Sequence, residues 1–107
     1  MATDEFDVKK YYTSAGAATD GIVWSPGTGA KWAVTDLIIS VSAATTVTLE
    51  DDLAAGDSVV MKLDLAANGG AVINLQTPLV SAEKDADLLV TTSAGNIYIT
   101  AVGYEIS

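Results

Sequence analysis

Hydrophobic residues recur along this chain mostly at every second position, which is the period of a β-strand. The clearest example lies near the C-terminus, where Ala86–Thr92, the turn Ser93-Ala94-Gly95 and Asn96–Ile106 predict a hairpin. The last strand of this hairpin is apolar on both faces. One face carries Tyr98, Val102, Tyr104 and Ile106, and the other carries Ile97, Ile99, Ala101 and Gly103. A strand with one solvated face would show polar residues at alternate positions. We therefore expect this strand to be central in a two-layer structure or to be covered by a partner chain.

The same period of two predicts strands in the rest of the chain. The predicted segments are Val8–Thr13, Gly21–Trp24, Lys31–Ser42, Thr45–Glu50, Ser58–Leu65, Ala71–Gln76 and the extended Thr77–Val80. Ser58–Leu65 could also form a helix capped by Asp57, but its near-strict alternation and its β-branched residues favour a strand. Asn68-Gly69-Gly70 predicts a tight hairpin turn between two of these strands.

About eight short strands at close spacing, with no helix, predict an all-β single domain that forms a β-sandwich or a small barrel. We expect an extended N-terminal arm over residues 1–20 and the sandwich domain over residues 21–107. We expect the core to contain the alternating apolar residues of the strands: Val34, Leu37, Ile39, Val47, Leu49, Val59, Met61, Leu63, Ile73, Leu75, Leu88, Val90, Ile99 and Val102.

Composition limits the function classes that fit this sequence. Half of the 107 residues are hydrophobic and 18% are charged, which is typical of a folded domain with one core. Cysteine, histidine and arginine are absent, which removes thiolate metal sites, the usual general base and the bidentate phosphate clamp. The net charge of −9 disfavours nucleic acid and anionic membranes as partners. The acidic N-terminus lacks the apolar region of a signal peptide, so we expect a protein that is made without export.

Acidic residues offer the remaining candidate for site chemistry. Glu50, Asp51, Asp52 and Asp57 could begin a calcium site, but they lack the Asp-x-Asp-x-Asp-Gly spacing, and a solvated loop is the better interpretation. Paired carboxylates could also serve a glycosidase. However, no pair is marked as buried by its sequence neighbours, so we expect no catalytic residues, no cofactor and no metal.

Two tryptophans, Trp24 and Trp32, flank the Pro26-Gly27 turn. They could form an aromatic platform for a sugar. Alternatively, they could pack at an edge of the sandwich or anchor a subunit interface. The residues alone leave these alternatives open.

Three stretches together carry a family resemblance. They are Trp32–Ser40, Leu63–Gly70 and Thr91–Glu105, the last of which ends in Gly103-Tyr104-Glu105. Over about Lys31–Ser107 the chain resembles the small β-sandwich domains of tailed-bacteriophage virion proteins. In that group, such domains are similar to jelly rolls that associate as trimers. Short free-standing versions look like capsid decoration (cement) proteins, and longer relatives lie in tail fibres or baseplates.

The resemblance implies a structural function without catalysis. We expect a homotrimer that binds the major capsid protein at capsomer junctions on the surface of the virion, after assembly in the host cytoplasm. The alternative is a tail or baseplate module that recognises carbohydrate. The expected partner-binding residues are Phe6, Tyr11, Tyr12, Trp24 and Trp32, and the expected oligomer interface is Ile97, Ile99 and Ala101. The last three belong there only if they are not core.

Overall fold

The computed structural model describes residues 8–16 and 21–107, which form eight β-strands. In chain order these are β1 (Lys9–Gly16), β2 (Gly21–Trp24), β3 (Lys31–Val41), β4 (Thr45–Leu53), β5 (Gly56–Leu65), β6 (Gly70–Val80), β7 (Leu88–Thr92) and β8 (Asn96–Ile106). The all-β prediction is confirmed. Ser58–Leu65 lies within β5, so the helix alternative for this segment is wrong.

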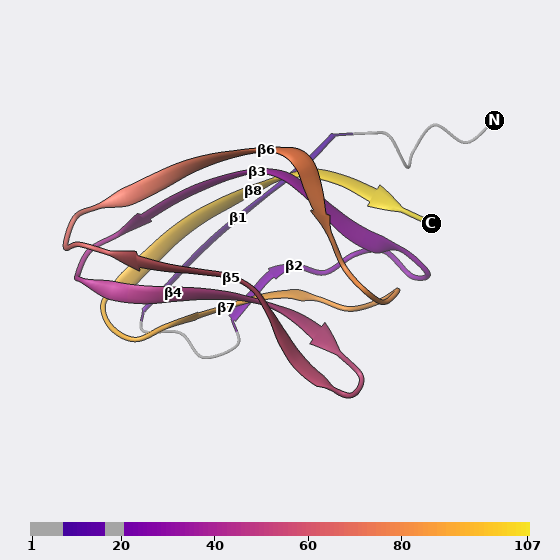
Figure 1. Ribbon diagram of the computed structural model, residues 1–107, viewed down its shortest axis with the longest axis horizontal. Helices are drawn as coiled ribbons and strands as arrows, with labels where there is room; N and C mark the ends of the chain where they lie inside the picture. Colours follow the sequence, from indigo (N-terminus) through magenta and orange to yellow (C-terminus); the bar gives the residue numbers. More distant parts are fainter. Residues whose placement is uncertain (1–7, 17–20) are drawn as a thin grey trace.

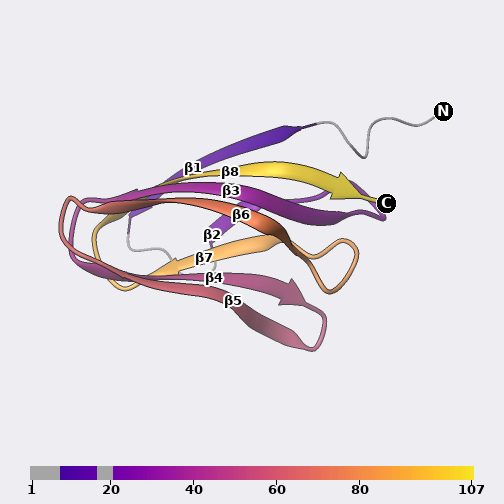
Figure 2. The ribbon, with the colours of Figure 1, turned by 45° about the horizontal axis from the view of Figure 1, so that its top comes forward.

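The strands form two four-stranded antiparallel sheets packed face to face (Figures 1 and 2). Sheet A has the order β1-β8-β3-β6, and sheet B has the order β2-β7-β4-β5. Eight strands divided in this way between two sheets, with most connections crossing from one sheet to the other, are the topology of a jelly roll. The predicted jelly-roll-like β-sandwich is therefore the observed fold.

Strand β1 includes part of the predicted N-terminal arm. Lys9–Gly16 pairs along its full length with β8, from Lys9 opposite Gly103 to Gly16 opposite Asn96. This part of the predicted arm is therefore an edge strand of the sandwich, longer than the short strand expected at Val8–Thr13. The arm stays a prediction for residues 1–7, which lie outside the described residues, as do residues 17–20.

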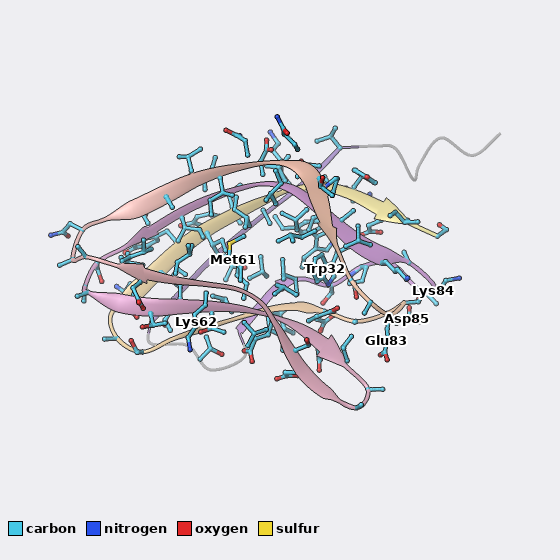
Figure 3. The ribbon with its side chains drawn as sticks, viewed as in Figure 1. Trp32, Met61, Lys62, Glu83, Lys84 and Asp85 are labelled. Carbon is cyan, nitrogen blue, oxygen red and sulfur yellow. The ribbon has the colours of Figure 1, made fainter. Side chains whose placement is uncertain are left out.

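The core fills the space between the two sheets, where Figure 3 shows Trp32 and Met61. Most of the predicted core residues are buried or packed against the buried cluster. Two are not. Val102 faces outward from sheet A, because Ile97, Ile99 and Ala101 occupy the inner face of β8. Val59 is 57% exposed, because a β-bulge shifts the register of β5.

The Asn68-Gly69 turn also differs from its prediction. Asn68 adopts a φ of 58°, and the Gly69 amide donates a 2.9 Å hydrogen bond to the Ala66 carbonyl, so a tight turn forms as expected. However, β5 belongs to sheet B and β6 to sheet A, so the turn crosses between the sheets and does not close a hairpin.

Candidate protein-binding surface

The predicted oligomer interface lies inside the sandwich. Ile97, Ile99 and Ala101 are each 0% exposed and belong to the core cluster between the sheets. They occupy the inner face of β8, which is the second strand of sheet A and packs against sheet B. In this fold they cannot contact another chain, so this prediction is wrong.

The two tryptophans are also core residues, and both are 0% exposed. The Trp24 indole Nε1 donates a 2.9 Å hydrogen bond to Glu105 Oε2, and its ring packs 4.8 Å from the ring of Tyr11. Trp32 lies between the sheets (Figure 3). Neither ring can stack on a sugar or anchor a partner from these positions, so the predictions of a carbohydrate platform and of partner contact are wrong for both residues.

The three N-terminal aromatic residues have different outcomes. Phe6 lies outside the described residues. Tyr11 is half-buried against Trp24 and the core. Tyr12 points the opposite way along β1 and is 65% exposed. Of the predicted partner-binding residues that the structure describes, Tyr12 is the one that lies well out on the surface.

Tyr12 belongs to an apolar row that runs across the whole outer face of sheet A. It pairs with Thr100 on β8, Thr100 pairs with Ile38 on β3, and Ile38 pairs with Val72 on β6. Ile38 is 51% exposed and Val72 is 71% exposed. Residues paired in this way across neighbouring strands project on the same side of a sheet. The row is therefore a continuous strip of surface.

More apolar side chains flank this row on the same face. Tyr98 lies on one side, and Val102 and Tyr104 on the other, all along β8. Ala33 pairs with both Tyr104 and Val80, which extends the surface onto the end of β6. Among the described residues, eight large hydrophobic side chains are exposed, and five of them lie on this face. We call the surface made by Tyr12, Ile38, Val72, Val80, Tyr98, Val102 and Tyr104 the apolar face.

The outer face of sheet B is different in chemistry. Its strands β4 and β5 carry Glu50, Asp52, Asp57, Lys62 and Asp64 on the side away from the core. In contrast, the central part of the apolar face carries two charged residues, Lys10 on β1 and Asp36 on β3. An apolar face that is poor in charge, on a chain with a net charge of −9, has the composition of a protein contact surface.

One acidic residue of the predicted loop, Asp51, has a structural role. Most of Glu50–Asp57 belongs to β4 and β5, which form a hairpin with a tight turn. The Asp51 side chain is 2% exposed and accepts 2.8 Å hydrogen bonds from Ser81 Oγ and from the Ala82 amide. Asp51 therefore holds the β6–β7 loop against β4, while Asp52 points to the surface.

Other kinds of site are scarce in the described part of the chain. There, no group of three or more acidic, histidine or cysteine side chains is placed to hold a metal ion. A shallow depression lies beside the turn that carries Glu83, Lys84 and Asp85, which Figure 3 labels. Within residues 8–16 and 21–107, no helix has the length and apolar character to cross a membrane. The apolar face is the most distinctive surface in this part of the chain.

The sequence matches no protein-family model and no curated protein. Two solved structures share the fold. The Drosophila NLP core is 12% identical, with a TM-score of 0.52, and the match covers 92% of this chain and 97% of that chain. A protein of the Bacillus endospore appendages, which are disulfide-linked pili, is also 12% identical, with a TM-score of 0.52 over 96% of this chain and 91% of that chain.

A structure of infectious bursal disease virus matches less well. Its TM-score is 0.22 at 14% identity, over 95% of this chain and 37% of that chain. This TM-score is too low to indicate a shared fold. The comparisons therefore show the jelly-roll fold alone.

Proposed function

We propose that this protein is a structural assembly protein, and that its specific function is to decorate the capsid of a tailed bacteriophage. The apolar face is the observation that carries the proposal. Five exposed large hydrophobic side chains gathered on one side of a small acidic domain are costly in water and become favourable when a protein surface covers them. In this proposal, the apolar face is buried in the assembled state.

The proposed decoration role rests on this surface together with the resemblance to tailed-bacteriophage virion proteins. A cement protein works through binding energy alone, since many copies on the virion surface each brace a contact between capsomers. Such a protein needs no nucleophile and no metal. The major capsid protein is the proposed partner, and the N-terminal residues 1–7 are the proposed second contact. The threefold association implied by the resemblance stays a prediction.

The two similar folds come from a protein described as forming pentamers and from pili. This fold therefore serves in assemblies of many copies in other proteins. At 12% identity the likeness extends to the fold only, so the proposal for this chain rests on its own surface.

Substitution of Ile38 by lysine tests the proposal. Ile38 lies at the centre of the apolar row, and burying an ammonium group there without a partner is strongly unfavourable. We expect Ile38→Lys to lower binding at least about tenfold in co-sedimentation with shells assembled from the major capsid protein of the same phage genome.

Val59→Lys is the matched control, because Val59 is similarly exposed (57%) but lies on β5 in sheet B. We expect this variant to sediment with shells as the wild type does. Equal binding by Ile38→Lys and the wild type would refute the use of the apolar face. A gene located among tail genes, away from a major capsid protein gene, would count against decoration.

A further inference from the structure

The two charged residues of the apolar face have symmetrical positions around β8. Lys10 on β1 pairs with Val102 from one side, and Asp36 on β3 pairs with Val102 from the other. Each charge therefore lies one strand away from β8, which is about 4.8 Å in a sheet. The residues of the next row follow the same arrangement, since Tyr12 and Ile38 both pair with Thr100.

We propose that the apolar face binds the apolar face of a second copy of this chain, related by a two-fold axis that runs along β8. This inference rests on the proposed function. It assigns the β1, β8 and β3 part of the same surface to a second copy, leaves β6 outside this contact, and replaces the threefold association that the resemblance implies with a two-fold one. A two-fold axis makes an interface isologous, so that if residue i contacts residue j, residue j also contacts residue i. The apolar face must then be complementary to itself.

Rotation about an axis along β8 places β1 of one copy over β3 of the other and keeps every row at its own height. Lys10 of each copy then lies opposite Asp36 of the other, which forms two ion pairs of opposite charge. In the next row, Tyr12 lies opposite Ile38 twice. Along the axis, Tyr98 and Val102 each meet their own counterpart. A two-fold axis across the strands, centred on the Thr100 row, would instead place Lys10 opposite the Ser14 position and leave both charges without partners.

The size of the contact fits a weak dimer. With the axis along β8, the strands that overlap are β1, β8 and β3, and β6 of each copy extends beyond the contact. Three strands about 4.8 Å apart and about seven residues of about 3.3 Å each give a footprint of roughly 330 Å² per copy. Two copies would bury about 700 Å² in total, which is below the usual size of a stable specific interface. We therefore expect a reversible dimer whose population rises with protein concentration.

Charge reversal tests this geometry in sedimentation velocity on the full chain. Lys10→Asp places two carboxylates opposite each other, and Asp36→Lys places two ammonium groups opposite each other. In each variant both ion pairs of the dimer become repulsive. We expect each variant to raise the dimer dissociation constant about 100-fold at low salt, with a smaller effect at high salt.

An equimolar mixture of the two variants gives the most specific result. In a mixed dimer, the introduced aspartate of one variant faces the introduced lysine of the other, and the original Asp36 faces the original Lys10. Dimerisation should therefore return to about the wild-type strength. Asp36→Lys also makes the net charge of −9 less negative. If only the overall repulsion between two negative chains mattered, this variant would associate more tightly than the wild type. The two-fold contact predicts that it associates more weakly.

Lys62→Asp is the control variant, because it makes the same change of charge on the outer face of sheet B. It should dimerise as the wild type does. A monomeric or trimeric wild type, single variants that dimerise normally, or a mixture that stays monomeric would each overturn the inference. If only these tests fail, while Ile38→Lys still abolishes shell binding, the proposed function stands. If Ile38→Lys also binds shells normally, the proposed function fails as well.

Discussion

Gly103 lies where two neighbouring strands come unusually close. A Cβ atom at this position would overlap the backbone carbonyl oxygen of Ala33 on β3. Thr35 forms a bulge in β3 beside this point, and its Oγ1 donates a 3.1 Å hydrogen bond to the Val102 carbonyl. The glycine of the Gly-Tyr-Glu sequence is therefore required by the backbone of the sheet.

Gly103→Ala should destabilise the fold by about 3 kcal/mol, because a methyl group cannot fit without separating β3 from β8. Urea denaturation measures this change in the free energy of unfolding. Gly27→Ala is the control, since a Cβ there meets only Glu105 Oε1 at an ordinary 3.4 Å, and it should change stability by less than about 0.5 kcal/mol. Equal stability of the two variants would contradict this account of Gly103.

The tryptophans show what residue type alone cannot reveal. Exposed aromatic rings are common at binding sites, but a buried ring has the same sequence signature. In this fold Glu105 decides the position of Trp24, because one carboxylate oxygen accepts from Trp24 Nε1 and the other accepts from the Gly27 amide at 3.2 Å. These partners lie about 80 positions apart in the sequence, so no local pattern could indicate the contact.

At the scale of the strand, period-two alternation predicted most of the strands correctly but not their pairing. β7 and β8 lie in different sheets, so the predicted C-terminal hairpin is wrong. Alternation placed the long strands and identified β8 as apolar on both faces. The run Leu37-Ile38-Ile39 carried a further signal, since three consecutive apolar residues in a strand place at least one of them on each face of the sheet. Alternation could not say which face points inward, because strand order and the second sheet decide that. For this reason Ile99 was expected in the core or, if not there, at a partner interface, and Ile38 was expected at neither.

The bulge in β5 explains why Val59 was expected in the core. Leu49 pairs with Met61, but Glu50 pairs with Val59, so Val60 is the extra residue. Beyond this point the alternation changes phase. Val60 packs against the core and Val59 points outward. Both residues are valines, so the sequence contains no difference that would reveal the change.

Val60→Thr and Val59→Thr distinguish the two positions with the same substitution. Threonine at position 60 brings a hydroxyl group toward the core and should cost about 1 kcal/mol, while threonine at position 59 remains in water and should cost less than about 0.5 kcal/mol. Thermal or urea denaturation gives both values. A larger loss of stability for Val59→Thr than for Val60→Thr would contradict the placement of Val60 toward the core.

At the scale of the whole molecule, the sandwich has two unlike outer faces. Sheet B presents carboxylates, which keep that side in water, while sheet A presents the apolar face. Antiparallel sheets commonly bury one face and hydrate the other, and sheet B follows this rule. Sheet A does not. The second apolar face of β8 is therefore part of an exposed surface that a partner can cover.

Hydroxyl-radical footprinting of the tyrosines is the most direct measurement of this claim. Tyr12 and Tyr98 lie on the apolar face and are exposed in the single chain, while Met61 lies on β5 in the other sheet and is half-buried. When the dilute protein passes into its assembled state, on shells or at high concentration, the reactivity of Tyr12 and Tyr98 should fall several-fold and that of Met61 should stay unchanged. An assembly that forms while Tyr12 and Tyr98 keep their full reactivity would contradict the proposal that the apolar face is the contact surface.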